Sequence, residues 1–231
     1  MPENVLLSGI VGSTAYGLAH AGSDVDRLGL FAAPAEEFHG LGRPAESHVT
    51  TAPDRTLHEA AKWCRLALGC NPSSSELAWL PPELYEVRTP LGEELIAIRG
   101  SFLSSKAVRG SYLGYAEQQF RKLRTRDTAD RAGRARAAKH ARHLVRLLEQ
   151  GTRLHESGEL VVRPAEPERV RELGERIAER PELAAELLAD AERRFDRRGV
   201  LPGAPDPAPA EAWLRRVRAA HYTWAADPVA G

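Results

Sequence analysis

The chain has 231 residues, and its 32 Lys and Arg side chains are balanced by 32 Asp and Glu, so the formal net charge is zero. Hydrophobic residues make up 42% and charged residues 28% of the chain, which excludes an intrinsically disordered protein. The sequence has no apolar run near the roughly 18 residues of a membrane helix and no signal-peptide pattern, and its two cysteines exclude a disulfide framework, so we expect a cytoplasmic protein without a membrane partner.

The zero net charge conceals segments of different sign. Residues 1–98 hold 6 basic and 13 acidic side chains, whereas residues 99–150 hold 13 basic and 4 acidic ones. Residues 151–231 are nearly balanced, with 13 basic and 15 acidic side chains. A basic segment with interleaved aromatic residues is typical of a surface that contacts a polyanion, although a solvated arginine-rich helix has the same composition.

The first third of the chain predicts a small α/β unit. In chain order we expect a strand ending in a Gly-Ser turn, a short helix closed by Gly22, a second strand, one or two strands broken at Pro53, and two helices. These cover residues 4–13, 14–23, 24–34, 48–60, 59–68 and 71–81. The sequence therefore places its strands before residue 98, apart from a short strand or extended turn expected over residues 159–164.

The rest of the chain is mainly helical by its periodicity. We expect helical segments over residues 91–123, 131–158, 166–199 and 211–225, with a Pro/Ala linker near residues 202–210. The second of these ends near Gly151 or Gly158, and the third is split near Pro181. The apolar face of the second consists of Ala138, Ala141, Leu144, Val145 and Leu148. We therefore predict two regions: an α/β core over residues 1–98 and a mainly helical region over residues 99–231, basic at 99–150.

Two short motifs carry the chemistry. Asp24 and Asp26 are spaced i and i+2 on the expected second strand, so both carboxylates point to one face and can converge on divalent cations. Hard oxygen ligands of this kind suit Mg²⁺. Gly12 and Ser13 place backbone amides and a hydroxyl where a helix begins, which favours phosphate binding. Each motif alone also occurs in ordinary turns, but their succession within 20 residues favours phosphoryl or nucleotidyl transfer.

These motifs resemble those of a known superfamily. Gly12-Ser13-x-Ala15-Tyr16-Gly17 followed by Ser23-Asp24-x-Asp26 resembles the signature of the DNA polymerase β superfamily of nucleotidyltransferases. Five further segments of the sequence resemble its RNA-repair-associated, RlaP-like branch. They are Pro53-Asp54, Leu57-His58-Glu59, Asn71-Pro72, Arg109-Gly110-Ser111-Tyr112-Leu113-Gly114-Tyr115 and Lys139-His140-Ala141-x-His143. The resemblance covers residues 5 to about 163.

The resemblance implies an α+β fold with a small mixed sheet and a metal-dependent nucleotidyltransferase. Such an enzyme transfers a nucleoside monophosphate from an NTP to an acceptor hydroxyl, here an RNA end, and releases pyrophosphate. It implies two Mg²⁺ or Mn²⁺ ions held by Asp24, Asp26 and a third acid on a neighbouring strand. Asp54, at the start of the strand over residues 54–59, is the candidate; Glu59 is the alternative, because it lies on that strand's other face and only one face can look at the metals.

The same resemblance extends the predicted site beyond the metal ligands. Lys139 and His140 join Gly12, Ser13 and Ser23 as the expected nucleotide- and phosphate-binding residues. In the basic segment, the residues expected to bind nucleic acid are Arg109, Tyr112, Arg121, Arg124 and Arg126. For Tyr112, packing in the core is an equally good explanation.

Two other functions remain open. The acceptor could be a protein or small-molecule hydroxyl, as for other members of the superfamily. The chain could also be an inert module that keeps the fold to bind nucleotide or RNA, although intact Asp24 and Asp26 argue against loss of catalysis. The sequence does not specify the oligomeric state.

Overall fold

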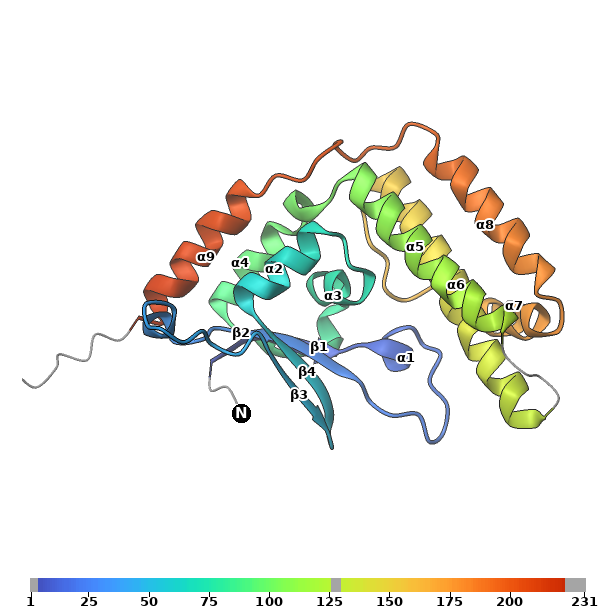
Figure 1. The fold of residues 1–231 in the computed structure, drawn as a ribbon, viewed down its shortest axis with the longest axis horizontal. Coiled ribbons are helices and arrows are strands. Elements are labelled where there is room, and N and C mark those ends of the chain that lie inside the picture. The colour runs from blue at the N-terminus through green and yellow to red at the C-terminus, as the bar shows by residue number, and fades with distance from the viewer. Residues whose placement is uncertain (1–3, 126–129, 223–231) are drawn as a thin grey trace, which may run out of the picture.

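The computed structural model describes residues 4–125 and 130–222, and it confirms the predicted α+β fold. A mixed five-stranded sheet has the order β3-β4-β2-β1-β5, in which β2 and β4 are parallel and the other neighbours antiparallel (Figure 1). The strands are β1 Val5–Ile10, β2 Arg27–Phe31, β3 Ser47–Thr51, β4 Asp54–Glu59 and β5 Tyr85–Arg88.

Helices cover one face of this sheet. They are α2 Ala60–Leu68, α3 Pro72–Glu76, α4 Pro90–Ala97 and, from much further along the chain, α9 Ala208–Ala220 (Figure 1). The short α1, Gly12–Ala15, follows β1, and single 3-10 turns are η1 Ala35–Phe38, η2 Leu77–Trp79, η3 Pro82–Leu84 and η4 Arg99–Phe102. One hydrophobic core joins the sheet to α2 and α9, and in it Trp213 is fully buried and donates its indole N–H to the Leu91 carbonyl (2.8 Å). We call the five strands with α1–α4 and α9 the sheet lobe.

The other four helices form a second layer beside the sheet lobe, which we call the helical lobe. They are α5 Ser105–Arg124, α6 Arg131–Ser157, α7 Pro167–Glu179 and α8 Glu182–Phe195, and they share a second hydrophobic core (Figure 1). The apolar face predicted for α6 is buried, including Ala141, Leu144 and Val145. This helix passes Gly151 and ends at Gly158, whose φ of 75° provides the left-handed cap.

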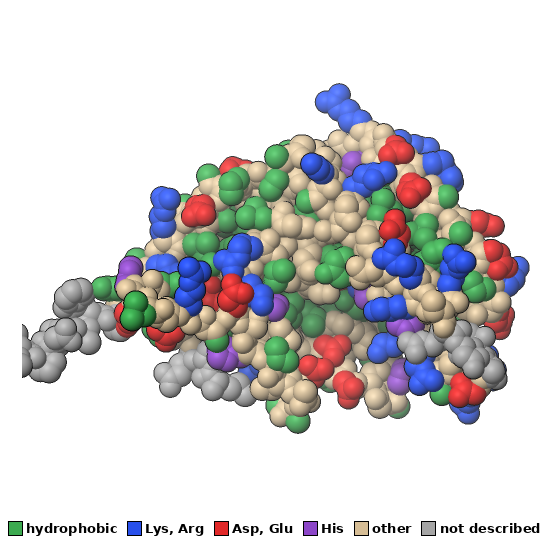
Figure 2. Space-filling model, viewed as in Figure 1, with side chains coloured by type: hydrophobic (Ala, Val, Ile, Leu, Met, Phe, Trp, Pro, Cys, Tyr) green, Lys and Arg blue, Asp and Glu red, His purple; other side chains and the backbone are tan. Residues whose placement is uncertain are grey.

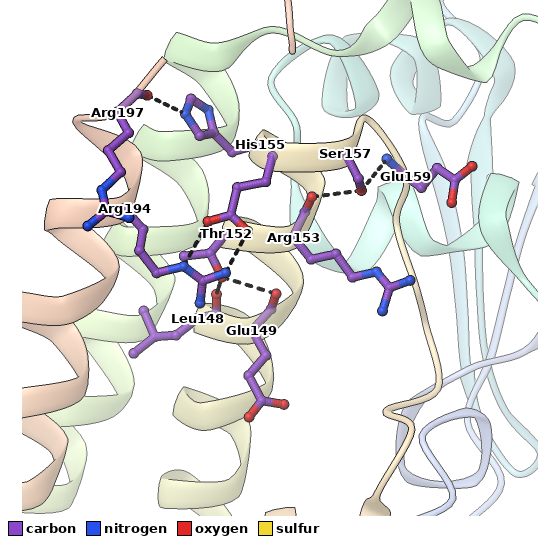
Figure 3. A network of polar contacts seen from close by, with 10 residues as sticks. Leu148, Glu149, Thr152, Arg153, His155, Ser157, Glu159, Arg194 and Arg197 are labelled. Atoms are coloured by element: carbon purple, nitrogen blue, oxygen red, sulfur yellow. Dashed lines mark hydrogen bonds and ion pairs between the residues drawn. The ribbon is translucent and has the colours of Figure 1, made fainter. Parts of the chain in front are cut away.

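Polar contacts fix the C-terminal half of α6 against α8 and the chain that follows it (Figure 3). His155 donates from Nε2 to the Arg197 carbonyl (2.9 Å), and Arg194 donates twice to the Glu156 carboxylate (2.8 and 2.7 Å). Gly199 allows this approach, because a Cβ there would lie 2.4 Å from the His155 carbonyl oxygen. The distal end of the helical lobe is therefore rigidly packed.

The structure corrects three sequence-based expectations in the sheet lobe. The helix expected over residues 14–23 ends at Ala15 instead of Gly22, because the chain turns at Gly17 with φ 68°. Asp24 and Asp26 precede β2 instead of lying on it, because β1 ends at Ile10 and leaves them no partner strand. The edge strand β5 was not expected.

No helix of the described residues is long and apolar enough to cross a membrane.

Candidate active site

Three of the predicted acidic residues meet at one end of the sheet. Asp24 and Asp26 lie in the segment entering β2, and Asp54 begins β4. Since β2 and β4 are parallel with Arg27 opposite Arg55, the residues just before these two enter their strands side by side. The carboxyl groups of Asp26 and Asp54 are close enough to share a hydrogen bond, and Asp24 lies near enough to act on Asp26 electrostatically.

This clustering changes the acidity of Asp26. Burial raises the pKa of its carboxyl above the ordinary value, the negative charges of Asp54 and Asp24 raise it further, and Lys139 opposes them. Repulsion between close carboxylates is what a bound cation relieves, and the oxygen donors are those that Mg²⁺ or Mn²⁺ prefers. Among the described residues there is no ready-made group of three metal-binding side chains, so the donor set fits a divalent ion by its chemistry and not by a finished geometry.

The predicted Gly-Ser turn lies directly against this carboxylate. Gly12 has φ 67°, and a Cβ at this position would stand 2.1 Å from Asp26 Oδ2, so only glycine leaves room for the carboxylate. The Val11 amide donates to the Asp26 carbonyl (2.9 Å), which fixes the two segments together. Ser13 lies in α1, half-buried, beside this contact. The structure therefore brings the proposed phosphate turn and the proposed metal ligands into one place.

The structure separates the two alternatives for the third acid. Glu59 lies at the far end of β4, where its carboxylate accepts from the Ala61 amide (2.8 Å) and pairs with Arg218 (2.7 Å). It is buried and begins α2. Asp54, and not Glu59, is therefore the acid beside Asp26; its role as a ligand stays a prediction.

Ser23 has a local structural partner. Its Oγ accepts from the His20 amide (3.0 Å) and its own amide donates to the His20 carbonyl (2.9 Å), closing the turn before Asp24. A part in phosphate binding stays a prediction, because the hydroxyl already serves this turn.

α6 faces the carboxylates from the helical lobe. Lys139 is exposed and near enough to Asp26 to affect its pKa. His140 is hydrogen-bonded through Nδ1 to Gln119 of α5 (2.9 Å). Burial, with the charges of neighbouring cations including Arg146, lowers the pKa of His143 to about 3, so this residue is a neutral imidazole. Figure 2 shows acidic side chains at the lower edge of the molecule, with Lys, Arg and His side chains beside them toward the helical lobe.

The predicted nucleic-acid residues have different surroundings. Arg121 and Arg124 are exposed at the end of α5; Arg121 is 3.9 Å from Glu117, and Arg124 lies over the Phe120 ring. Arg109 is three turns away on the same helix and pairs with Asp196 (3.2 Å). Arg126 lies outside the described residues.

Tyr112 is a correction to the predicted nucleic-acid interface. Its side chain is 0% exposed and packs where α5 crosses Gly151 of α6, at which a Cβ would lie 2.6 Å from the Tyr112 side chain. A ring enclosed in this way has no free face for a base, so the core explanation holds. The Gly151 within α6 is explained by the same contact.

Two motifs that suggested the family resemblance join the lobes. Asn71 caps α3 through its side-chain oxygen and donates from Nδ2 to the Tyr115 hydroxyl (2.7 Å). Ser111 donates to the Gly69 carbonyl (2.6 Å). These contacts tie the α2–α3 corner to α5, so both motifs maintain the position of one lobe on the other.

Sequence reasoning missed a buried ionic contact between the lobes. Glu76 of α3 and Arg146 of α6 are 1% and 3% exposed in their side chains, and Arg146 Nη1 donates to Glu76 Oε1 (2.5 Å). Tyr16, just after α1, donates to the other oxygen of Glu76 (2.7 Å). The one signal in the sequence was Arg146, which lies beside the apolar face predicted for α6. It does not stand out, because α6 is rich in arginine.

A mixed sheet with clustered carboxylates beside a Gly-Ser turn, faced by a basic helix, has the features expected of a polymerase β-type nucleotidyltransferase. The model of the RlaP family, the RNA repair pathway DNA polymerase beta family, matches residues 2–199, and the chain belongs to this family. Its name connects the chain with nucleotidyl transfer in RNA repair. No curated protein that was compared matches the chain.

Proposed function

We propose that the protein transfers a nucleoside monophosphate from an NTP to a hydroxyl at an RNA end and releases pyrophosphate. The observation that carries this proposal is the contact of Asp26 with Asp54 on one side and with the Gly12 turn on the other. Membership of the RNA repair family supports the same reaction class.

Asp24, Asp26 and Asp54 would hold the divalent ions, Mg²⁺ or Mn²⁺ and two in number. Bound there, such ions neutralise the triphosphate and lower the pKa of the acceptor hydroxyl. The chain itself orients the nucleotide: the amides and hydroxyl of the turn at Ser13 bind phosphate oxygens, and Lys139 adds a positive charge from the opposite lobe. Attack of the acceptor oxygen on the α-phosphorus then forms one P–O bond, breaks the bond to pyrophosphate and releases the hydroxyl proton to water.

The surface beside these carboxylates favours a polyanionic acceptor. Exposed cations gather at the end of α5 and the start of α6; among the described residues they are Arg121, Lys122, Arg124, Arg131, Arg134, Arg136 and Lys139. A row of cations next to the reacting hydroxyl binds successive phosphates of RNA, whereas a small-molecule acceptor needs no such surface.

The test is transfer of label from each of the four NTPs, with α-³²P, in the presence of Mg²⁺ or Mn²⁺. Reactions with RNA carrying a free 3′-hydroxyl, with blocked RNA and without RNA separate RNA from the protein itself as the acceptor. Asp24→Asn plus Asp26→Asn should abolish transfer while retaining the fold. Asp190→Asn, an exposed acid on α8, serves as the matched control. Label transfer that survives the double substitution contradicts the proposal.

A further inference from the structure

Arginines of the helical lobe and of the segment that precedes α7 contact the end of the turn proposed to bind the nucleotide. Arg163 donates to the Ala15 carbonyl (3.3 Å), and Arg171 of α7 donates to the Gly17 carbonyl (2.6 Å). Arg146 of α6 stacks on the Tyr16 ring, with 3.9 Å between the guanidinium carbon and the ring centroid. The three contacts fall on Ala15, which ends α1, and on the next two residues, Tyr16 and Gly17.

The contact at Tyr16 continues into a buried polar network. The Tyr16 hydroxyl donates to Glu76, and Arg146 donates both to Glu76 and to the Gln150 side-chain oxygen (2.5 Å each). Gln150 in turn donates to the carbonyls of Val161 and Val162 (3.2 Å each). Burial raises the pKa of Tyr16 well above its ordinary value, so the hydroxyl remains a proton donor.

Such a network is a poor means of adding stability. Removing two charges from water costs about as much as their mutual attraction returns, and apolar side chains of the same volume serve a core equally well. A fully hydrogen-bonded charge pair does fix the positions of its side chains, because its hydrogen bonds allow only one geometry. Here the pair fixes Tyr16, the residue that follows α1. The Tyr16 amide in turn donates to the Gly12 carbonyl (3.1 Å).

We propose that Tyr16 is a positioning residue for nucleotide binding, through which Glu76 and Arg146 fix the Gly12–Ala15 turn before the triphosphate arrives. The inference rests on the proposed function for the identity of the ligand. Because the turn is ordered in advance, binding does not have to order it, and the effect is on nucleotide affinity more than on the chemical step. The helical lobe thus takes part in the nucleotide site without touching the nucleotide at these residues.

The test is Tyr16→Phe, which removes the hydroxyl and keeps the ring under Arg146. Tyr85→Phe is the matched control, because it also deletes a hydroxyl bonded within the sheet lobe, to the Leu77 carbonyl (2.8 Å), away from α1. We expect KM for NTP to rise about tenfold and kcat to change by less than about twofold in Tyr16→Phe. Amide hydrogen exchange over residues 12–18 should accelerate in Tyr16→Phe alone. Each variant loses one hydrogen bond, so both should melt below wild-type protein while staying folded.

A second variant guards against a general effect on folding. Arg163 is exposed, and Arg163→Ala removes its bond to the Ala15 carbonyl without opening the core. It should raise KM in the same direction, by about twofold to threefold, with exchange again faster over residues 12–18. If wild-type protein binds NTP and Tyr16→Phe equals Tyr85→Phe in KM and in hydrogen exchange, the positioning role of Tyr16 is overturned and the proposed function still stands. If wild-type protein binds no nucleotide, the proposed function fails and this role fails with it.

Discussion

The carboxylate cluster should cost the folded protein stability, and Asp26→Asn should recover it. The raised pKa of Asp26 means that the folded state favours its protonated form, through burial and the charges of Asp54 and Asp24. Stability from this group is therefore fully present below the unfolded-state pKa and is lost as pH rises through the folded-state pKa. At neutral pH the charged cluster opposes folding, and the isosteric amide removes one of its charges.

The gain in the free energy of unfolding depends on how strongly solvent screens the repulsion between Asp26 and its neighbouring carboxylates. Two like charges at about 4 Å repel by about 4 kcal/mol near a protein surface and by about 1 kcal/mol in bulk water. Asp26 is half-buried, whereas Asp24 and Asp54 are exposed, so solvent screening places the gain near the lower figure. In a protein of this length, about 1 kcal/mol corresponds to a rise in Tm of about 2–4 °C.

The assay is thermal unfolding of wild-type protein and Asp26→Asn at low ionic strength with EDTA, between pH 4 and pH 8. The advantage of the variant should be largest near pH 8 and should shrink as the pH falls. Adding Mg²⁺ should raise the Tm of wild-type protein more than that of the variant. Asp190→Asn, an acid that faces Arg193, should show no such gain. A variant that melts at or below the wild-type temperature in EDTA at pH 8 refutes the reasoning.

Three further outcomes are expected. Asp54→Asn should abolish nucleotide transfer, whereas Glu59→Gln should lower Tm and leave transfer measurable, because Glu59 caps α2 away from the site; the reverse pattern in a transfer assay would restore Glu59 as the third acid. Arg121→Glu with Arg124→Glu should weaken RNA binding and flatten its salt dependence in titrations at several NaCl concentrations, and an unchanged slope would remove these residues from the interface. Trp213→Ala should destabilise the protein by about 3–5 kcal/mol in urea unfolding, since the ring is fully buried; a loss under about 1 kcal/mol would mean that α9 is not part of the core.

Local patterns were enough to predict most of the elements. Period-3.6 apolar residues predicted α6 and its buried face. The break at Pro53 predicted one or two strands, and the structure has two, β3 and β4. The edge strand β5 was missed because four residues provide too short an alternation. The helix after Gly12 was expected to be too long because the positive φ at Gly17 does not show in residue type alone.

The parts of the candidate site that depend on neighbouring residues were predicted from the sequence, whereas the parts that depend on contacts between distant segments were not. Asp24 and Asp26 were found from spacing along one segment, although the structure places them before the strand. The sequence made Asp54 the candidate third acid and Glu59 the alternative. Separating the two needed the parallel register of β2 and β4, which depends on pairing across the sheet. Tyr112 shows the limit most clearly: an aromatic residue in a basic segment has the same sequence pattern whether it faces RNA or Gly151.

The return of α9 to the sheet lobe has a consequence for the order in which the chain folds. The helical lobe draws its core mainly from residues 103–195 and can assemble from neighbouring segments. The sheet lobe is synthesised first, yet its core takes Ala210, Trp213 and Val217, which lie beyond residue 199, where the family match ends. During synthesis the first lobe to appear therefore keeps an apolar face exposed until α9 arrives, and a chain trimmed to residue 199 would retain that exposed face permanently.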